Sequence, residues 1–279
     1  GTLVGPDGAD ALVWAHPADP DGLADLLGRH PGLRWVQLPF AGIETYAPVL
    51  DDHRVWTCAK RIYGETTAEH ALTLLLAGFR DLRTYLRQRS WTRDRGRNLH
   101  GARITILGGG GIAEALIGLL APFRCHVVAV RRSGRPVPGA DRTVGPDGLL
   151  DAVRGVDAVV VALALTPETR GLVDGELLAA MGPTAWLVNV ARGGHVVTDD
   201  LVEALRSGTV AGAALDVTDP EPLPEGHPLW SLDNCLVTPH VANTHEMLRP
   251  RLARLVADNV RRFGAGEPLL GVVDPRLGY

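Results

Sequence analysis

A run of glycines between an apolar strand and an apolar helix constrains the fold of this chain more than any other feature. Gly108-Gly109-Gly110-Gly111 follows the strand-like residues 104–107 and precedes a helix-like stretch at 112–123. Glycines allow a tight turn and a close approach of the backbone, and the first turn of a helix offers unpaired N–H groups. Strand, turn and helix occur in the order that a dinucleotide-binding sheet requires, so we expect a dinucleotide pyrophosphate at this turn.

Length, charge and cysteine usage narrow the class of protein. A chain of 279 residues with 46% hydrophobic residues predicts two domains with substantial cores. Its net charge of −4 argues against nucleic acid or a membrane surface as a partner. Cys58, Cys125 and Cys235 follow no metal or redox spacing. We therefore predict a protein of the reducing cytoplasm with no metal site, and we see no signal peptide or membrane-spanning stretch.

Strand-like and helix-like stretches alternate regularly from Arg103 onward. Ala158–Ala162 is apolar at every position, which indicates a strand buried on both faces and hence a parallel sheet covered by helices. The expected strands lie at 103–107, 126–130, 156–163, 185–190, 210–216 and 235–238, and the expected helices lie at 112–123, 147–154, 174–181 and 198–207.

The rest of the chain predicts a second, smaller α/β domain. Strands are expected at 11–15, 33–38 and 55–58, and helices at 21–28, 67–86 and 246–263. The polar, arginine-rich segment 87–100 reads as a surface crossing between domains, and its Trp91 is expected to pack rather than to contact a ligand. We place the nucleotide domain at 90–243 and divide the substrate domain between 1–89 and 244–279.

Three polar stretches each follow a strand of the nucleotide domain, at the edge where open α/β sheets bind ligands. They bring Arg192, Glu221 and His240 to one rim. An arginine can hold a carboxylate and polarise the adjacent carbonyl, and a histidine can donate a proton to the carbonyl oxygen. A carboxylate on the other imidazole nitrogen stabilises the charged ring. This trio suits the reduction of a 2-oxo acid.

The chain resembles the D-isomer-specific 2-hydroxyacid dehydrogenase family over nearly its whole length. The resemblance rests on Ala68-Glu69-His70, Leu99-His100-Gly101, Leu165-Thr166-Pro167-Glu168-Thr169, the Asn-x-Ala-Arg-Gly run at 189–193 and the Pro-His-x-Ala run at 239–242. It implies a Rossmann-type doubly wound parallel sheet inserted in a smaller flavodoxin-like α/β substrate domain. The segment 216–224, followed by His227-Pro228-Leu229, is most similar to the glyoxylate/hydroxypyruvate reductase branch.

This resemblance also assigns residues to the expected site. Arg192, Glu221 and His240 would be catalytic, and Asp216 would face the nicotinamide carboxamide. The substrate would contact the backbone of Ala41 and Gly42 and the side chain of Arg192. Arg61, in a bulky and basic segment where many relatives have small residues, is a further expected substrate contact. The other expected cofactor contacts are Gly108, Gly110, Gly111, Ile112, Arg131, Arg132, Ser133, Thr166, Val190, Ala191, His240 and Ala242. The family further implies a homodimer and a strand and helix before residue 1, so we expect the start to be truncated.

The loop after the second strand of the nucleotide domain bears on the choice of cofactor. An NAD-specific site places an acidic residue there for the ribose 2′-hydroxyl, whereas this chain has Arg131, Arg132, Ser133 and Arg135. Because arginine attracts a 2′-phosphate, we predict that NADP is preferred and that NAD is a second cofactor. The alternative is a solvated basic loop with no ligand.

Several alternatives stay open at this stage. Asp219 could pair with His240 in place of Glu221, which we favour because it precedes Pro222 as in the family. His70 is expected to support the domain interface, and His195 is grouped with surface or structural histidines. The chain could instead be a dinucleotide-sensing corepressor-like binding protein. It could also oxidise phosphite or phosphoglycerate on the same fold, whereas Glu221 disfavours formate oxidation, which pairs the histidine with glutamine.

Overall fold

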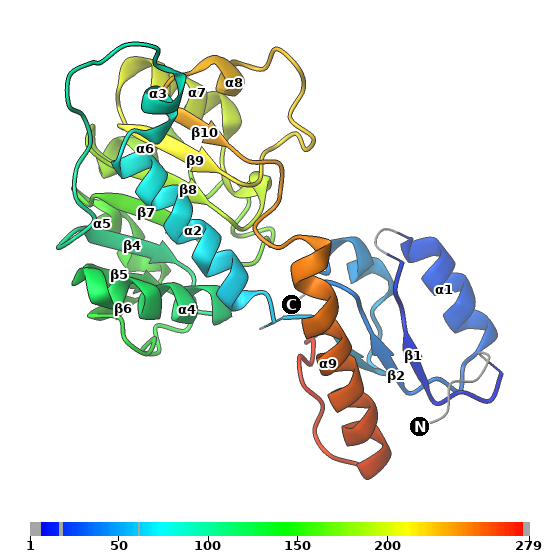
Figure 1. Cartoon of the computed structure of the whole chain (residues 1–279). Coiled ribbons are helices and arrows are strands. Elements are labelled where there is room, and N and C mark those ends of the chain that lie inside the picture. Colours follow the sequence, from blue (N-terminus) through cyan, green and yellow to red (C-terminus); the bar gives the residue numbers. More distant parts are fainter. Residues whose placement is uncertain (1–6, 17–18, 61, 276–279) are drawn as a thin grey trace. The chain divides into compact units, whose positions relative to one another are not determined.

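The computed structural model describes residues 7–16, 19–60 and 62–275, and it divides into two compact units. The inserted unit runs from Gly64 to Asn243 (Figure 1). The terminal unit comprises the chain up to Tyr63 and from Thr244 onward. The expected fold class, a doubly wound parallel sheet inserted in a smaller α/β domain, is confirmed.

A seven-stranded parallel sheet forms the centre of the inserted unit. Its strands lie in the order β10-β9-β8-β7-β4-β5-β6, so the order reverses between β4 and β7. The strands are β4 (Arg103–Leu107), β5 (His126–Val130), β6 (Arg142–Val144), β7 (Ala158–Val161), β8 (Trp186–Asn189), β9 (Gly212–Leu215) and β10 (Cys235–Val237). Each was expected except the short edge strand β6. Ligands of open α/β sheets bind at such a reversal, outside the carboxyl ends of the strands.

Helices cover both faces of this sheet, and alternate residues of the strands face them. Val159 and Val161 of β7 pack into one core with α5, α6 and α7, whereas Ala158 and Val160 pack into the other with α2 and α4. This alternation explains why β7 is apolar at every position. The helices are α2 (Gly64–Phe79), α3 (Leu82–Arg87), α4 (Gly111–Leu120), α5 (Leu149–Val153), α6 (Gly175–Met181), α7 (Thr198–Ser207) and α8 (Pro228–Ser231), with the 3-10 turns η2 (Ala121–Phe123), η3 (Pro146–Gly148) and η4 (Gly193–His195).

The helix α2 packs within the inserted unit. The domain boundary that we expect at 89/90 would instead assign this helix to the substrate domain. The helix lies along one face of the sheet, against α4 (Figure 1). A Cβ on Gly64 would come within 2.8 Å of the Gly111 carbonyl oxygen, so the glycines let the two helices approach closely. The compact units therefore divide at 63/64, while the position of the functional domain boundary stays a prediction.

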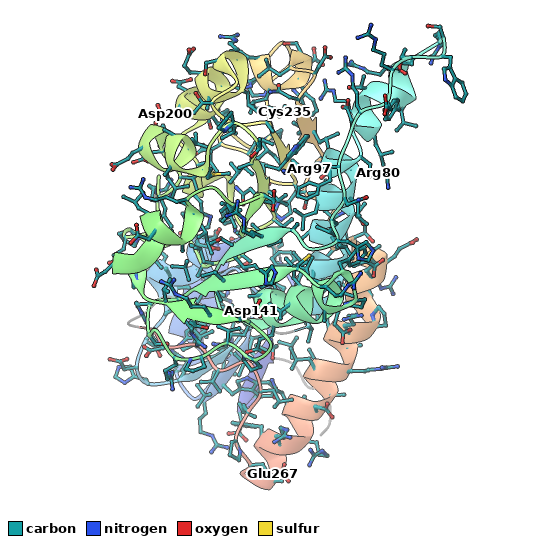
Figure 2. The ribbon with its side chains drawn as sticks, turned by 90° about the vertical axis from the view of Figure 1, so that its left-hand side faces the viewer. Arg80, Arg97, Asp141, Asp200, Cys235 and Glu267 are labelled. Carbon is teal, nitrogen blue, oxygen red and sulfur yellow. The ribbon has the colours of Figure 1, made fainter. Side chains whose placement is uncertain are left out.

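Two expectations for residues 67–100 are wrong. The single helix expected at 67–86 breaks at Asp81, whose φ of 50° lies in the left-handed region, and continues as α3. Trp91 does not pack against the described part of the chain, because its side chain is fully exposed. The segment that carries it extends away from the rest of the inserted unit, beyond Arg80 (Figure 2).

The terminal unit is a small α/β layer with a three-stranded parallel sheet. Its elements are β1 (Ala11–Val13), α1 (Pro20–Arg29), β2 (Trp35–Gln37), η1 (Glu44–Val49), β3 (Val55–Thr57) and α9 (His245–Ala265). Thr57 accepts a hydrogen bond from the Trp35 indole and donates one to Gln37. The Asn259 side chain of α9 donates to the same Gln37 oxygen. This fully buried network anchors the last helix on the sheet.

Candidate active site

The carboxyl ends of β8, β9 and β10 form the rim that carries the predicted catalytic residues. Asn189 is paired with Leu215, and Leu215 with Val237, so these strand ends lie in register. Arg192, Glu221 and His240 each follow one of the three ends along the chain. An arginine, a glutamate and a histidine therefore lie on the loops at the carboxyl edge of this sheet.

The loop after β8 holds Arg192 through hydrogen bonds to its backbone. The Asn189 amide donates to the Arg192 carbonyl at 2.8 Å, and its oxygen accepts from the Ala191 N–H at 3.0 Å. The Nδ1 atom of His195, which is fully buried, lies 3.0 Å from the same Arg192 carbonyl. A Cβ on Gly193 would collide with the Thr218 carbonyl, so the last position of the Asn-x-Ala-Arg-Gly run requires glycine.

The His240 imidazole forms a short contact with Glu221. Its Nδ1 lies 2.7 Å from Glu221 Oε1, and both side chains are about half exposed. Asp219, the alternative partner, instead lies 3.9 Å from Arg170. The geometry therefore favours Glu221 over Asp219 as the partner of His240 and leaves the other imidazole nitrogen for a ligand.

Asp216 is a buried carboxylate beneath the segment that carries His240. Oδ1 accepts from the Thr238 hydroxyl at 2.6 Å and the Val241 N–H at 2.9 Å, and Oδ2 accepts from the Ala242 N–H at 3.0 Å. His70 Nε2 lies 3.2 Å from Oδ1. Burial alone raises the pKa of Asp216, but the hydrogen bonds outweigh it and lower the pKa to about 2. The role expected for Asp216 at a nicotinamide carboxamide stays a prediction.

The glycine turn after β4 has the features that a pyrophosphate site needs. Gly108 has a φ of 134°, and a Cβ there would collide with the Ala162 carbonyl. Gly110 precedes α4, and no side chain caps the helix, so the N–H groups around Gly111 and Ile112 are not used by a cap. These residues fit a dinucleotide phosphate, because the backbone can approach closely and the helix dipole favours an anion.

The arginine loop, residues 131–135, follows β5 beside this turn. A Cβ on Gly109 would come within 2.9 Å of the Arg131 side chain, so that arginine lies over the glycine turn. Arg132 and Ser133 are exposed. The pKa of Glu168 is lowered first by a hydrogen bond with Thr166 and further by the charge of Arg132. The arginine loop and the Thr166 segment therefore lie near the same end of the sheet.

The other predicted cofactor and substrate residues belong to separate segments of the chain. Val190 and Ala191, directly after β8, are buried, as is Ala242. Ala41 and Gly42 belong to the terminal unit, where Ala59 N–H donates to the carbonyl of the preceding Phe40 at 2.9 Å. Arg61 lies outside the residues that the structure describes.

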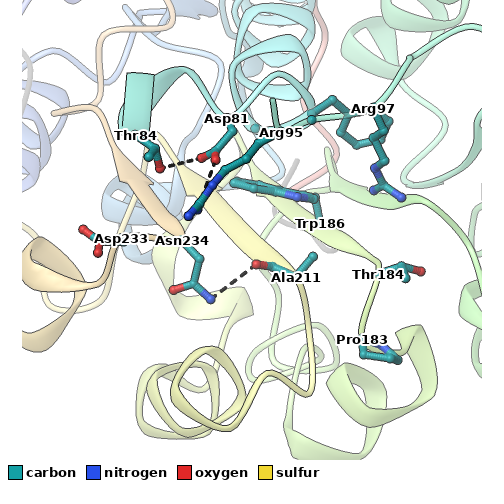
Figure 3. Close-up of a pocket in the computed structure, with 13 residues that line it drawn as sticks. Asp81, Thr84, Arg95, Arg97, Pro183, Thr184, Trp186, Ala211, Asp233 and Asn234 are labelled. Carbon is teal, nitrogen blue, oxygen red and sulfur yellow. Dashed lines mark hydrogen bonds and ion pairs between the residues drawn. The ribbon is translucent and has the colours of Figure 1, made fainter. Parts of the chain in front are cut away.

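A separate cavity of about 440 Å³ lies at the opposite, amino-terminal edge of the same strands (Figure 3). Trp186, Ala211 and Asn234 line it where β8, β9 and β10 begin. Its charged groups already have partners in this chain, since Arg95 lies 3.6 Å from Asp81. None of the predicted catalytic or cofactor residues lines this cavity.

Two histidines near the rim were not predicted as parts of the site. His70 contacts Asp216 and Thr238, and His195 contacts the backbone of Arg192. The Asn-x-Ala-Arg-Gly-Gly-His run could have indicated His195 through its spacing from the arginine. No sequence signal connects His70 with Asp216, because 146 positions separate them.

Within the described residues, no group of three or more His, Cys, Asp or Glu side chains could hold a metal ion. No described helix is long and apolar enough to cross a membrane.

The chain is similar in sequence and in fold to known proteins. The sequence model for the NAD binding domain of D-isomer specific 2-hydroxyacid dehydrogenases matches residues 70–242. A glyoxylate/hydroxypyruvate reductase A from Serratia proteamaculans is 35% identical over 76% of this chain and 68% of its own length.

Two solved structures are similar over nearly the whole chain. A D-isomer specific 2-hydroxyacid dehydrogenase from Xanthobacter autotrophicus Py2, in complex with NADPH and MES, is 35% identical with a TM-score of 0.86, over 99% of this chain and 87% of that one. An NADPH-dependent glyoxylate/hydroxypyruvate reductase from Sinorhizobium meliloti, in complex with NADP and sulfate, is 29% identical with a TM-score of 0.84, over 98% and 87%.

Proposed function

Because the chain belongs to the D-isomer specific 2-hydroxyacid dehydrogenase family, we propose that its substrates are glyoxylate and hydroxypyruvate and that its preferred cofactor is NADPH. It is an NAD(P)-dependent oxidoreductase that transfers a hydride between a nicotinamide cofactor and a small 2-oxo or 2-hydroxy acid. The names of the similar reductases support the substrate class, and the segment 216–229 supports the same branch.

The observation that carries the proposal is the 2.7 Å contact between His240 Nδ1 and Glu221 Oε1. With Nδ1 held by the carboxylate, Nε2 can donate its proton to the carbonyl oxygen of the substrate during reduction and take it back during oxidation. The reduced nicotinamide supplies the hydride for the carbonyl carbon. Glu221 holds the ring at Nδ1, so that Nε2 is the nitrogen that exchanges the proton with the substrate.

Arg192 is proposed to hold the substrate carboxylate and polarise the carbonyl. Its guanidinium forms a planar fork that matches a carboxylate, and Asn189 and His195 hold its backbone. Ala41 and Gly42 would add backbone contacts from the terminal unit, and Arg61 would add a second positive charge. These roles stay proposals for each residue.

The NADPH preference rests on the arginine loop. Gly108, Gly110, Gly111 and Ile112 would hold the pyrophosphate, and Arg131 with Arg132 and Ser133 would contact the 2′-phosphate. Two of the similar structures contain NADPH or NADP, and an arginine at position 131 attracts rather than repels that phosphate. Val190, Ala191, Thr166, Asp216 and Ala242 would line the remainder of the cofactor site.

The assembly and the compartment are also proposals. The fully exposed Trp91, on a segment that extends from the inserted unit, supports a homodimer, because a large aromatic side chain is typical of protein interfaces. All three cysteines are free, which supports the reducing cytoplasm. A Trp91→Ser variant that stays dimeric in analytical ultracentrifugation would remove Trp91 from the interface.

A substrate panel tests the proposed function. The purified chain should oxidise NADPH with glyoxylate and with hydroxypyruvate. It should show no reduction of NADP by phosphite. Turnover of phosphite alone would favour the phosphite alternative, and tight NADPH binding without turnover of any 2-oxo acid would favour the corepressor-like alternative.

A further inference from the structure

His70 lies on α2 and reaches the buried carboxylate beneath the catalytic rim. Its Nε2 is 3.1 Å from the Thr238 hydroxyl and 3.2 Å from Asp216 Oδ1. The Thr238 hydroxyl donates its single hydrogen to Asp216 Oδ1 at 2.6 Å. Because that hydrogen is used, the hydroxyl can only accept from His70, and Nε2 must carry the proton. His70, Thr238 and Asp216 therefore form one connected network in which each direction of donation is fixed.

Asp216 in turn holds the backbone on both sides of His240. Its carboxylate accepts from the N–H groups of Val241 and Ala242, and its backbone carbonyl accepts from the His240 N–H at 2.8 Å. His240 has a φ of 53°, a left-handed conformation that non-glycine residues adopt only where the surroundings impose it. The bonds to Asp216 supply that constraint.

We propose that His70 is a positioning residue for His240, acting through Thr238 and Asp216. The proposal rests on the proposed function, in which His240 transfers the substrate proton. The Asp216 side chain is 1% exposed, and the His70 side chain is 18% exposed. A buried carboxylate needs donors from the protein, and His70 is the side-chain donor that comes from an element outside the strands β9 and β10. It ties the segment of His240 to a long helix packed on the sheet.

The consequence concerns the rate of proton transfer rather than substrate binding. An acid on a rim loop must stay near its productive position, and a small displacement lowers the rate strongly. Arg192 is held by Asn189 and His195 on a separate loop. Loss of His70 should therefore reduce kcat and leave the KM for the 2-oxo acid nearly unchanged.

The test compares His70→Leu, His70→Gln and Glu69→Gln in the full-length protein with NADPH. His70→Leu should lower kcat for glyoxylate reduction about 10- to 100-fold, with the KM for glyoxylate within about threefold of the wild type. His70→Gln places an amide N–H near the position of Nε2 and should recover most of the loss. Glu69→Gln changes an exposed neighbour on the same helix turn and should behave as the wild type.

Amide hydrogen exchange gives a readout that needs no turnover. In His70→Leu the N–H groups of Val241 and Ala242 should exchange faster, because Asp216 is less well held, while amides in β4 and β7 keep their protection. If His70→Leu does not fold, Thr238→Val removes the bridging hydroxyl at nearly constant volume and should produce the same loss of kcat and the same faster exchange.

The outcomes separate this inference from the proposed function. A wild type that reduces no 2-oxo acid overturns the proposed function, and faster exchange at Val241 and Ala242 would then still show that His70 holds the segment. An active wild type, an inactive His240→Gln and a His70→Leu variant with wild-type kcat and unchanged exchange would overturn the role of His70. A loss confined to the melting temperature, with kcat preserved, would also overturn it.

Discussion

At the scale of single residues, the rim is built from polar groups with fixed partners. Glu221 holds one imidazole nitrogen of His240, and Asp216 holds the backbone around it. Asp219, three residues from Asp216, lies 3.9 Å from Arg170. Three acidic residues of one short segment thus have three different partners, and of the three it is Glu221 that contacts the His240 ring.

Arg192→Ala should lower both substrate affinity and turnover. In its proposed role the arginine holds the substrate carboxylate and polarises the carbonyl, and a charge-assisted contact of about 1.5–3 kcal/mol corresponds to a loss on the order of 100-fold in kcat/KM. Steady-state kinetics with glyoxylate measure the effect. Arg154→Ala, on an exposed surface pair with Asp151, is the control for a general change in charge. Near-normal kinetics in Arg192→Ala would remove this residue from the substrate site.

Glu221→Gln should lower the rate of reduction. The carboxylate holds Nδ1 of the His240 ring at 2.7 Å, and glutamine lacks its charge, so kcat for glyoxylate with NADPH, measured by steady-state kinetics, should fall about 10- to 100-fold. The matched control is Asp219→Asn, whose carboxylate faces Arg170 and not His240. If Asp219→Asn lowers kcat and Glu221→Gln does not, the assignment of the two carboxylates is reversed.

Asp216→Asn should weaken the fold in a pH-dependent way. The folded pKa of Asp216 is about 2, below its ordinary value of 3.8, so the ionised carboxylate stabilises the native state above pH 4. Urea unfolding at pH 7 should show a loss of about 2 kcal/mol or more, which shrinks as the pH falls from 4 towards 2. Asp233→Asn, which is exposed, is the control. A loss that does not vary with pH would contradict the low pKa.

At the scale of elements, the turns determine where ligands can bind. Gly108 and Gly193 sit where a Cβ would meet a carbonyl oxygen of a neighbouring loop, so both glycines let loops approach each other at the carboxyl edge of the sheet. Helix α4 begins at the first of these loops with no side-chain cap. The arginine loop follows the neighbouring strand β5. Uncapped backbone N–H groups and cationic side chains are thus brought together by the loops that follow two neighbouring strands, β4 and β5.

Arg131→Asp should reverse the preference between NADPH and NADH. One or two charge-assisted contacts with the 2′-phosphate, at about 1.5–3 kcal/mol each, give a preference of about 10- to 1,000-fold for NADPH. The aspartate removes an attraction and adds a repulsion, while it can accept from the ribose hydroxyl of NADH. The ratio of the two kcat/KM values measures this, with the exposed Arg206→Asp as the charge control. Equal use of both cofactors by the wild type would show that the arginine loop is a solvated surface loop that does not contact the 2′-phosphate.

The elements that the sequence predicts well are those set by local patterns. The apolar run of β7 and the glycines before α4 are local signals, and the expected strand and helix occur there. The break of the long helix at Asp81 was missed, because the apolar spacing continues through it. The short strand β6 at the sheet edge carries no distinctive pattern. The His70–Asp216 contact was also missed, because it depends on how α2 packs on the sheet and not on any local motif.

At the scale of the whole molecule, the chain consists of two compact units, and the inserted unit contains the glycine turn, the arginine loop and the proposed catalytic trio. The terminal unit contains Ala41 and Gly42, which are proposed to contact the substrate, and it is held together by a buried polar network around Asn259. The residues proposed for chemistry and for cofactor selection therefore belong to the inserted unit.

The central claim is that His240, paired with Glu221, is the acid for reduction of a 2-oxo acid. The most direct test is kcat/KM for glyoxylate with NADPH, measured side by side for the wild type and His240→Gln. The wild type should turn over glyoxylate, and the variant, which keeps a hydrogen-bonding side chain without a transferable proton, should lose about 100- to 10,000-fold in kcat/KM. NADPH binding, followed by its fluorescence, should persist in the variant. A His240→Gln variant that reduces glyoxylate at the wild-type rate would contradict the account.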